Sequence, residues 1–115
     1  SRYPESIVLQ ACECECVNSY YTVAARLLDT DKWVQLHEHY TSLGAEGFYA
    51  AVANPYLEPA LADCVERYGW YEGMCPNAEV LQKAVMSFKT NYRNLDHAIQ
   101  DAALLDKALT ELLRS

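Results

Sequence analysis

A run of alternating cysteines and glutamates near the amino end constrains the fold more than any other segment. Cys12, Cys14 and Cys16 are separated by Glu13 and Glu15. In a strand the three thiols would point to one side, because side chains repeat every second residue. In a helix Cys12 and Cys16 share one face and Cys14 lies on another. A strand would therefore gather the thiols into a cluster, whereas a helix would place two of them in a core.

The residues around the run favour the helix. Residues 5–29 contain no glycine or proline, and they follow Pro4, a residue tolerated at the first helical position. Projected at helical spacing, the apolar residues of this segment cover one broad arc and the polar residues gather opposite. We therefore predict a helix over residues 5–29. Glu13 would lie within its apolar arc, where burial raises the pKa of a carboxyl group.

The rest of the chain also has a helical pattern. The chain has only four glycines and four prolines, which is few for a small all-β protein. We predict further helices over residues 31–43 and 58–68, and a short helical turn within residues 46–53. Apolar residues at three-four spacing between residues 81 and 113 predict either one helix over residues 78–113 or two helices divided at residues 90–94, with Asn94 as a cap.

Together these segments predict the fold class. At 115 residues the chain has the length of a single domain, and 51% of its residues are hydrophobic. We expect one all-α domain over residues 1–115, a small bundle of four to six helices whose first and last members are long.

Charge narrows the classes of partner. Sixteen acidic and nine basic side chains give a net charge of −7, and the basic residues are scattered singly. Nucleic acids and anionic membranes are bound mainly by grouped Lys and Arg, so neither is expected as a ligand. An acidic surface attracts basic proteins. We therefore expect another protein, of basic character, as the partner.

The five cysteines suggest disulfide bonds. The candidate residues are Cys12, Cys16, Cys64 and Cys75, and the sequence does not choose among their pairings. Such a density of cysteines joined as disulfides is typical of proteins outside the cytoplasm. We therefore predict an extracytoplasmic protein, secreted or periplasmic.

Motifs for catalysis or cofactor binding are not found in the sequence. It has no glycine-rich phosphate loop, no serine hydrolase elbow and no zinc-protease motif. His37 and His39 are two residues apart in a predicted helix, so they would lie on nearly opposite faces. We expect no enzyme activity, no catalytic residue, no metal site and no cofactor.

The clearest candidate for a binding site is a glycine-bounded loop at residues 69–76. Its sequence, with the end of the preceding helix, brings several large side chains together, and Trp, Tyr and Arg are the residues that most often anchor protein interfaces. The predicted partner-binding residues are Arg67, Tyr68, Trp70, Tyr71 and Glu72.

Three functional hypotheses follow. The first is a non-enzymatic protein-binding domain of the inhibitor, immunity or adaptor type, which uses the aromatic loop and the acidic surface. The second is a helical bundle that binds a metal or small molecule through Cys12 and Cys16. The third is a self-assembling structural protein, a homodimer formed through the apolar stripe of the C-terminal helix, to which Leu95 and Ile99 belong.

Overall fold

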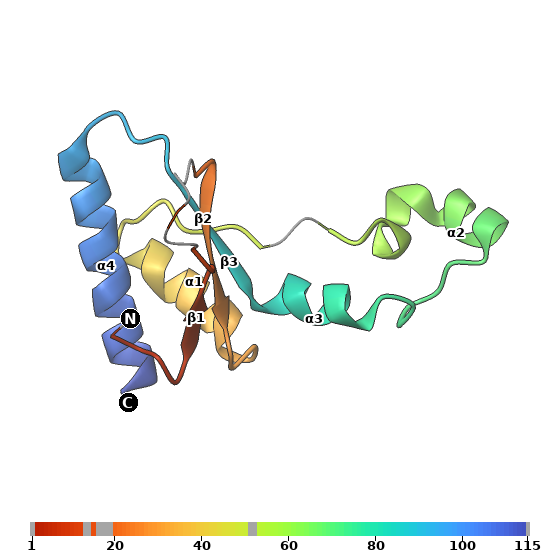
Figure 1. Cartoon of the computed structure of the whole chain (residues 1–115), viewed down its shortest axis with the longest axis horizontal. Helices are drawn as coiled ribbons and strands as arrows, with labels where there is room; N and C mark the ends of the chain where they lie inside the picture. The colour runs from red at the N-terminus through yellow and green to blue at the C-terminus, as the bar shows by residue number, and fades with distance from the viewer. Residues whose placement is uncertain (1, 13–14, 16–19, 51–52, 115) are drawn as a thin grey trace.

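A three-stranded antiparallel sheet, packed against helices, is the centre of the molecule (Figure 1). The computed structural model describes residues 2–12, 15, 20–50 and 53–114. The described residues form four α-helices, two short 3-10 helices and this sheet, so the fold is mixed α/β and the prediction of an all-α bundle is wrong. In chain order the elements are β1 (Ile7–Leu9), β2 (Thr22–Leu27), α1 (Lys32–Ser42), η1 (Pro55–Leu57), η2 (Pro59–Leu61), α2 (Ala62–Tyr68), α3 (Pro76–Ala84), β3 (Val85–Lys89) and α4 (Leu95–Leu113).

The predicted first helix contains two strands instead. β1 and β2 pair in register, with Ile7 opposite Leu27 and Leu9 opposite Ala25. The apolar arc that suggested a helix was broad, and the same residues also satisfy a two-residue period: Ala25 and Leu27 are buried and Arg26 between them is exposed. Tertiary pairing selected this second pattern, because each strand gains a partner along the sheet. Pro4 opens a turn before β1 rather than a helix.

The central strand β2 also pairs with β3, which lies far away in the sequence. Ala25 lies opposite Met86 and Val23 opposite Phe88. The inward-facing side chains of the sheet pack on α1 and α4, and the core they form includes Leu27, Leu36 and Met86, all essentially inaccessible to solvent. We call this unit, consisting of the sheet, α1 and α4, the body.

Helix α1 agrees closely with the prediction for residues 31–43. Leu36 and Tyr40 of its apolar stripe are buried, and Trp33 donates a hydrogen bond from Nε1 to the carbonyl of Val85, 2.9 Å away. The predicted helical turn after it is wrong. The chain there is extended and Tyr49 forms an isolated β-bridge with Ser87. Gly47, at φ +88°, provides the left-handed conformation that turns the chain there.

The C-terminal part of the chain contains a strand, although the sequence pattern predicted only helices there. Of the two alternatives, only the second helix of the divided form is confirmed: Asn94 caps α4 by accepting a hydrogen bond at Oδ1 from the backbone N–H of His97, at 2.9 Å. Residues 85–89 nevertheless form β3. The unbroken three-four spacing was accidental, since Met86 points into the core at strand spacing.

Between β2 and β3 the chain leaves the body and returns to it. Residues 55–83 form a projection that contains η1, η2, α2 and most of α3, and α2 lies at its far end (Figure 1). We call these residues the arm. Its two ends meet beside β3, where Asn54 donates a hydrogen bond from Nδ2 to Oε1 of Gln82 at 2.8 Å. The arm gives the molecule its elongated shape, with dimensions of 50 × 38 × 28 Å.

Candidate binding surfaces

The predicted aromatic loop lies at the outer end of the arm. Helix α2 ends at Gly69, which has φ +67° and is therefore left-handed, and the chain then turns through residues 70–75. The Tyr68 and Trp70 rings stack with centroids 5.5 Å apart. Tyr68 and Tyr71 are 61% and 63% exposed. Neither tyrosine is therefore packed in a core.

The two charged residues predicted for this surface are also exposed. Arg67 lies in the last turn of α2 and Glu72 lies in the loop. All five predicted partner-binding residues therefore occur in one continuous segment at the tip of the arm, with Trp70 the only one that is half-buried.

A carboxylate that the sequence analysis missed holds the loop against the rest of the arm. Oε1 of Glu79 accepts hydrogen bonds from the Tyr56 hydroxyl at 2.7 Å and from the backbone N–H of Gly73 at 2.6 Å. The Tyr56 bond, followed by that of Gly73, lowers the pKa of Glu79. Tyr56 keeps its proton, because burial and then the Glu79 hydrogen bond raise its pKa. The spacing of these residues carried no signal, since the contact depends on how the arm folds back.

The predicted disulfides are contradicted. Cys12, Cys64 and Cys75 are free thiols that lie in different places: beyond β1, within α2 and just before α3. The prediction assumed that Cys12 occupied the core face of a long helix, and that helix does not form. Cys12 is instead exposed, with its Sγ hydrogen-bonded to the Tyr20 hydroxyl. Cys16 lies outside the described residues.

Metal ligands do not converge in the part of the chain that the structure describes. No group of three or more His, Cys, Asp or Glu side chains there could hold a metal ion. His37 stacks on Trp33, with ring centroids 5.6 Å apart, whereas His39 pairs with Glu111 at 2.5 Å. The two histidines therefore have unrelated surroundings. Glu13, predicted to be a buried carboxylate, lies outside the described residues.

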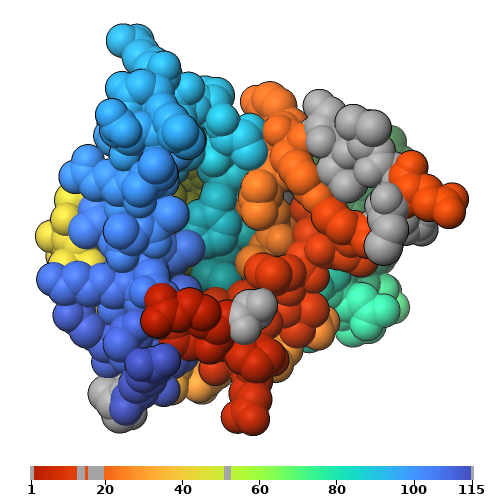
Figure 2. Space-filling model, turned by 60° about the vertical axis from the view of Figure 1, so that its left-hand side comes forward, coloured from red at the N-terminus to blue at the C-terminus, as the bar shows by residue number. Residues whose placement is uncertain are grey.

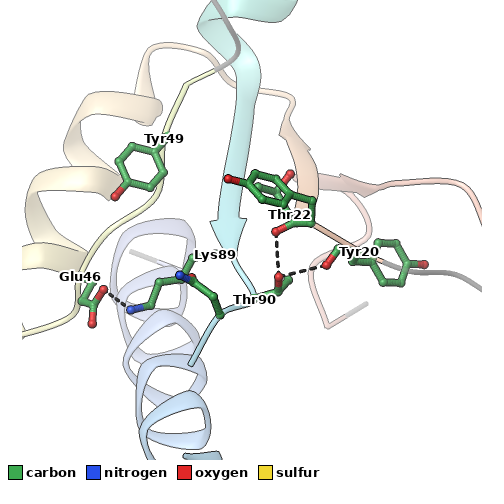
Figure 3. A pocket seen from close by; sticks show the side chains of 8 residues that line it. Tyr20, Thr22, Glu46, Tyr49, Lys89 and Thr90 are labelled. Carbon is green, nitrogen blue, oxygen red and sulfur yellow. Dashed lines mark hydrogen bonds and ion pairs between the residues drawn. The ribbon is translucent and has the colours of Figure 1, made fainter. Parts of the chain in front are cut away.

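A polar hollow of about 710 Å³ lies beside the end of β3 (Figure 3). Lys89 reaches across it to form an ion pair with Glu46, and this hydrogen bond lowers the pKa of the Glu46 carboxyl group. The Thr90 hydroxyl lies close to two backbone carbonyls, at 3.0 Å from that of Tyr20 and 2.7 Å from that of Tyr21. The two charged residues that line the hollow, Glu46 and Lys89, are thus paired with each other.

An apolar groove of about 360 Å³ lies between α4 and the sheet. Figure 2 shows it as a hollow with α4 on one side, β1 and β2 on the other and β3 at its floor. The groove is lined mostly by apolar side chains, and Asp101 provides the one carboxyl group among the lining residues. The sequence analysis did not find this site, because its lining residues come from five elements, β1, β2, α1, β3 and α4, that only the fold brings together.

Comparison with known proteins adds no assignment: the chain matches no family model, no curated protein and no solved structure. The described residues also contain no helix long and apolar enough to cross a membrane.

Proposed function

We propose that the protein is a non-enzymatic binding domain whose arm docks on a basic surface of another protein. One observation supports this proposal above all. None of residues 55–83, all of which the structure describes, is buried, yet the arm exposes large apolar side chains along its whole length. These are Leu57, Tyr68, Tyr71, Met74, Val80 and Leu81. A segment without a core gains most when a partner covers it.

The distribution of charge supports a basic partner. Residues 55–80 carry five acidic side chains and one basic side chain, which is a net charge of −4 out of −7 for the whole chain. Lys83 lies at the base of the arm, so it does not offset the charge of the tip. A projecting acidic segment accelerates the encounter with a basic surface and disfavours neutral or acidic ones.

The aromatic residues are the proposed anchors. Tyr68, Trp70 and Tyr71 offer large rigid rings at the tip, and Arg67 and Glu72 beside them would form the polar rim of the contact. The inhibitor, immunity and adaptor types of protein all use such a surface. Nucleic acid and membrane remain excluded from the proposed partners by the scattered basic residues.

An extracytoplasmic location remains part of the proposal, although the disulfides that suggested it are contradicted for the described cysteines. Counting free thiols in the native, unreduced protein by alkylation and intact mass tests it. Five free thiols in protein isolated from its natural compartment would argue for a reducing compartment.

Site-specific crosslinking tests the proposed surface. A photoreactive phenylalanine at position 71 should crosslink to a partner protein in an extract of the natural source. The same residue at position 49 is the matched control, because Tyr49 is equally exposed, at 68%, but lies on the body. The partner identified in this way should then bind the purified wild-type protein with an affinity that falls about tenfold or more in the Tyr68→Ala/Tyr71→Ala variant. A Tyr49→Ala variant should bind like the wild type.

Two results would contradict the proposal. One is that positions 49 and 71 crosslink to the same proteins with equal yield. The other is that the double variant, with unchanged thermal stability, binds the identified partner as tightly as the wild type.

Self-association through α4 is a second proposal, which a different observation favours. Leu95 and Ile99 lie one turn apart on α4 and are 73% and 57% exposed. An exposed apolar pair of this kind favours a helix-to-helix contact between two copies. Sedimentation at micromolar concentration should show a dimer that the Ile99→Asp substitution converts to a monomer. A wild-type monomer across this range would exclude the homodimer.

A further inference from the structure

The apolar groove exists because the helices cover only part of the inner face of the sheet. Leu9 and Val23 point to the same face as the buried residues Ala25 and Met86, as the strand register requires. They are nevertheless 57% and 40% exposed. On the facing side, α4 presents the small side chain of Ala102, which leaves the space open. The groove is therefore an unfilled part of the core, open on one side.

One end of the groove contains a buried carboxylate. Asp101 is only 4% exposed, and its Oδ2 accepts a hydrogen bond from the Tyr92 hydroxyl at 2.8 Å. The Tyr40 hydroxyl donates to the backbone carbonyl of Asp101 at 3.2 Å. Burial, helped by the nearby Asp101 charge, raises the pKa of Tyr40 to about 12, and burial and the Asp101 hydrogen bond also raise that of Tyr92. Both tyrosines are therefore neutral donors.

Asp101 forms no ion pair with any of the described residues. Their ion pairs involve other carboxylates, and Lys89, which lies 4.5 Å from the centroid of the Tyr92 ring, is paired with Glu46. A buried carboxylate is costly unless a cation or several hydrogen bonds compensate it. The Asp101 carboxylate is therefore the group in the groove that a positively charged ligand would contact.

The size of the groove indicates a small molecule, rather than a helix of another protein, as the ligand. A helix with its side chains is about 10 Å across, so about one turn of it would fill 360 Å³. A volume in this range is instead typical of small-molecule sites, which are mostly apolar and have a few polar groups that orient the ligand.

We propose that the groove binds a small apolar molecule with a single amine head, an alkylamine or arylalkylamine. The ammonium group donates to Asp101, and the hydrocarbon portion lies along Leu9, Val23 and Ala102. None of the lining residues belongs to the arm, so this proposal can be tested independently of the proposed protein-binding function.

Calorimetric titration with octylamine, octanoate and octanol tests the proposal, because the three share one chain length and differ in the head group. At pH 7 and 0.3 M NaCl, where long-range attraction by the net charge is screened, octylamine should bind about tenfold or more tighter than the other two. In the Asp101→Asn variant, which retains an acceptor for Tyr92, the preference for the amine should disappear.

A second pair of variants covers the case in which Asp101→Asn fails to fold. Ala102→Trp fills the groove from its α4 wall and should abolish octylamine binding. Ala103→Trp adds the same ring at the next position, which is exposed and does not line the groove, and should bind octylamine like the wild type. Equal affinity for the three ligands, absence of octylamine binding, or octylamine binding that survives Ala102→Trp would each overturn the proposal.

Discussion

The body and the arm of this chain are stabilised in different ways. The body buries side chains from all three strands and from α1 and α4, including a cluster of aromatic rings in which Phe48 contacts Trp33, Tyr40 and Phe88. The arm buries none of its residues and is held by local turns and a few hydrogen bonds, those to Glu79 above all. A single chain can thus combine a self-sufficient core with a segment whose apolar surface remains available for a partner.

The largest expected effect comes from truncating one core residue. Leu36 is completely buried, so Leu36→Ala should lower the free energy of unfolding by about 2–5 kcal/mol. Val80 in the arm is 59% exposed, and Val80→Ala should change the free energy of unfolding by less than about 0.5 kcal/mol. Urea unfolding of both variants measures the difference. Similar losses for the two substitutions would mean that the arm and the body share one cooperative core.

A smaller effect is expected when the arm is removed. The two ends of the arm are already joined at its base by Asn54 and Gln82, so replacing residues 56–79 with a Gly-Gly-Ser linker keeps that contact. The free energy of unfolding of the body should change by no more than about 1 kcal/mol, since loop closure depends only weakly on loop length. Circular dichroism and urea unfolding provide the measurement. A shortened protein that does not fold would show that the body depends on the arm.

The smallest effect is a pH dependence confined to the arm. The folded-state pKa of Glu79 lies below its ordinary value of 4.5, because the carboxylate accepts from Tyr56 and Gly73. The ionised group therefore stabilises the arm above pH 4.5, and this contribution is lost as the pH falls through the lowered value. Amide exchange at Gly73, corrected for its intrinsic pH dependence, should show this loss of protection.

The matched variants separate Glu79 from other carboxylates of the arm. Glu79→Gln should remove the pH-dependent step at Gly73, whereas Glu72→Gln, in the exposed loop nearby, should leave it in place. If the step persists in Glu79→Gln, the ionised carboxylate is not what holds the loop.

The two candidate sites, the aromatic loop in the arm and the groove in the body, differ in how much of them the sequence could predict. The aromatic loop could be located from the sequence, because glycines bound it and its large side chains are neighbours in the chain. The exposure of this loop could not be predicted from the sequence, because it depends on the projection of the arm away from the body. Neither the groove nor the Asp101 and Tyr92 pair could be predicted, because residues from β1, β2, β3 and α4 meet there only in the folded protein.

The sequence by itself determined the helices that have a terminating residue, a capping residue or an apolar stripe within their own segment. Gly69 ends α2, Asn94 caps α4, and the stripe that includes Leu36 and Tyr40 forms the buried face of α1. The tertiary structure alone decided the strands. Residues 22–27 and 85–89 fit a helical period as well as a strand period. The choice depends on pairing between residues 59 to 67 positions apart in the chain, from Arg26 with Val85 to Thr22 with Lys89. Such pairing lowers the free energy only after the chain has folded back, so no local window of sequence contains it.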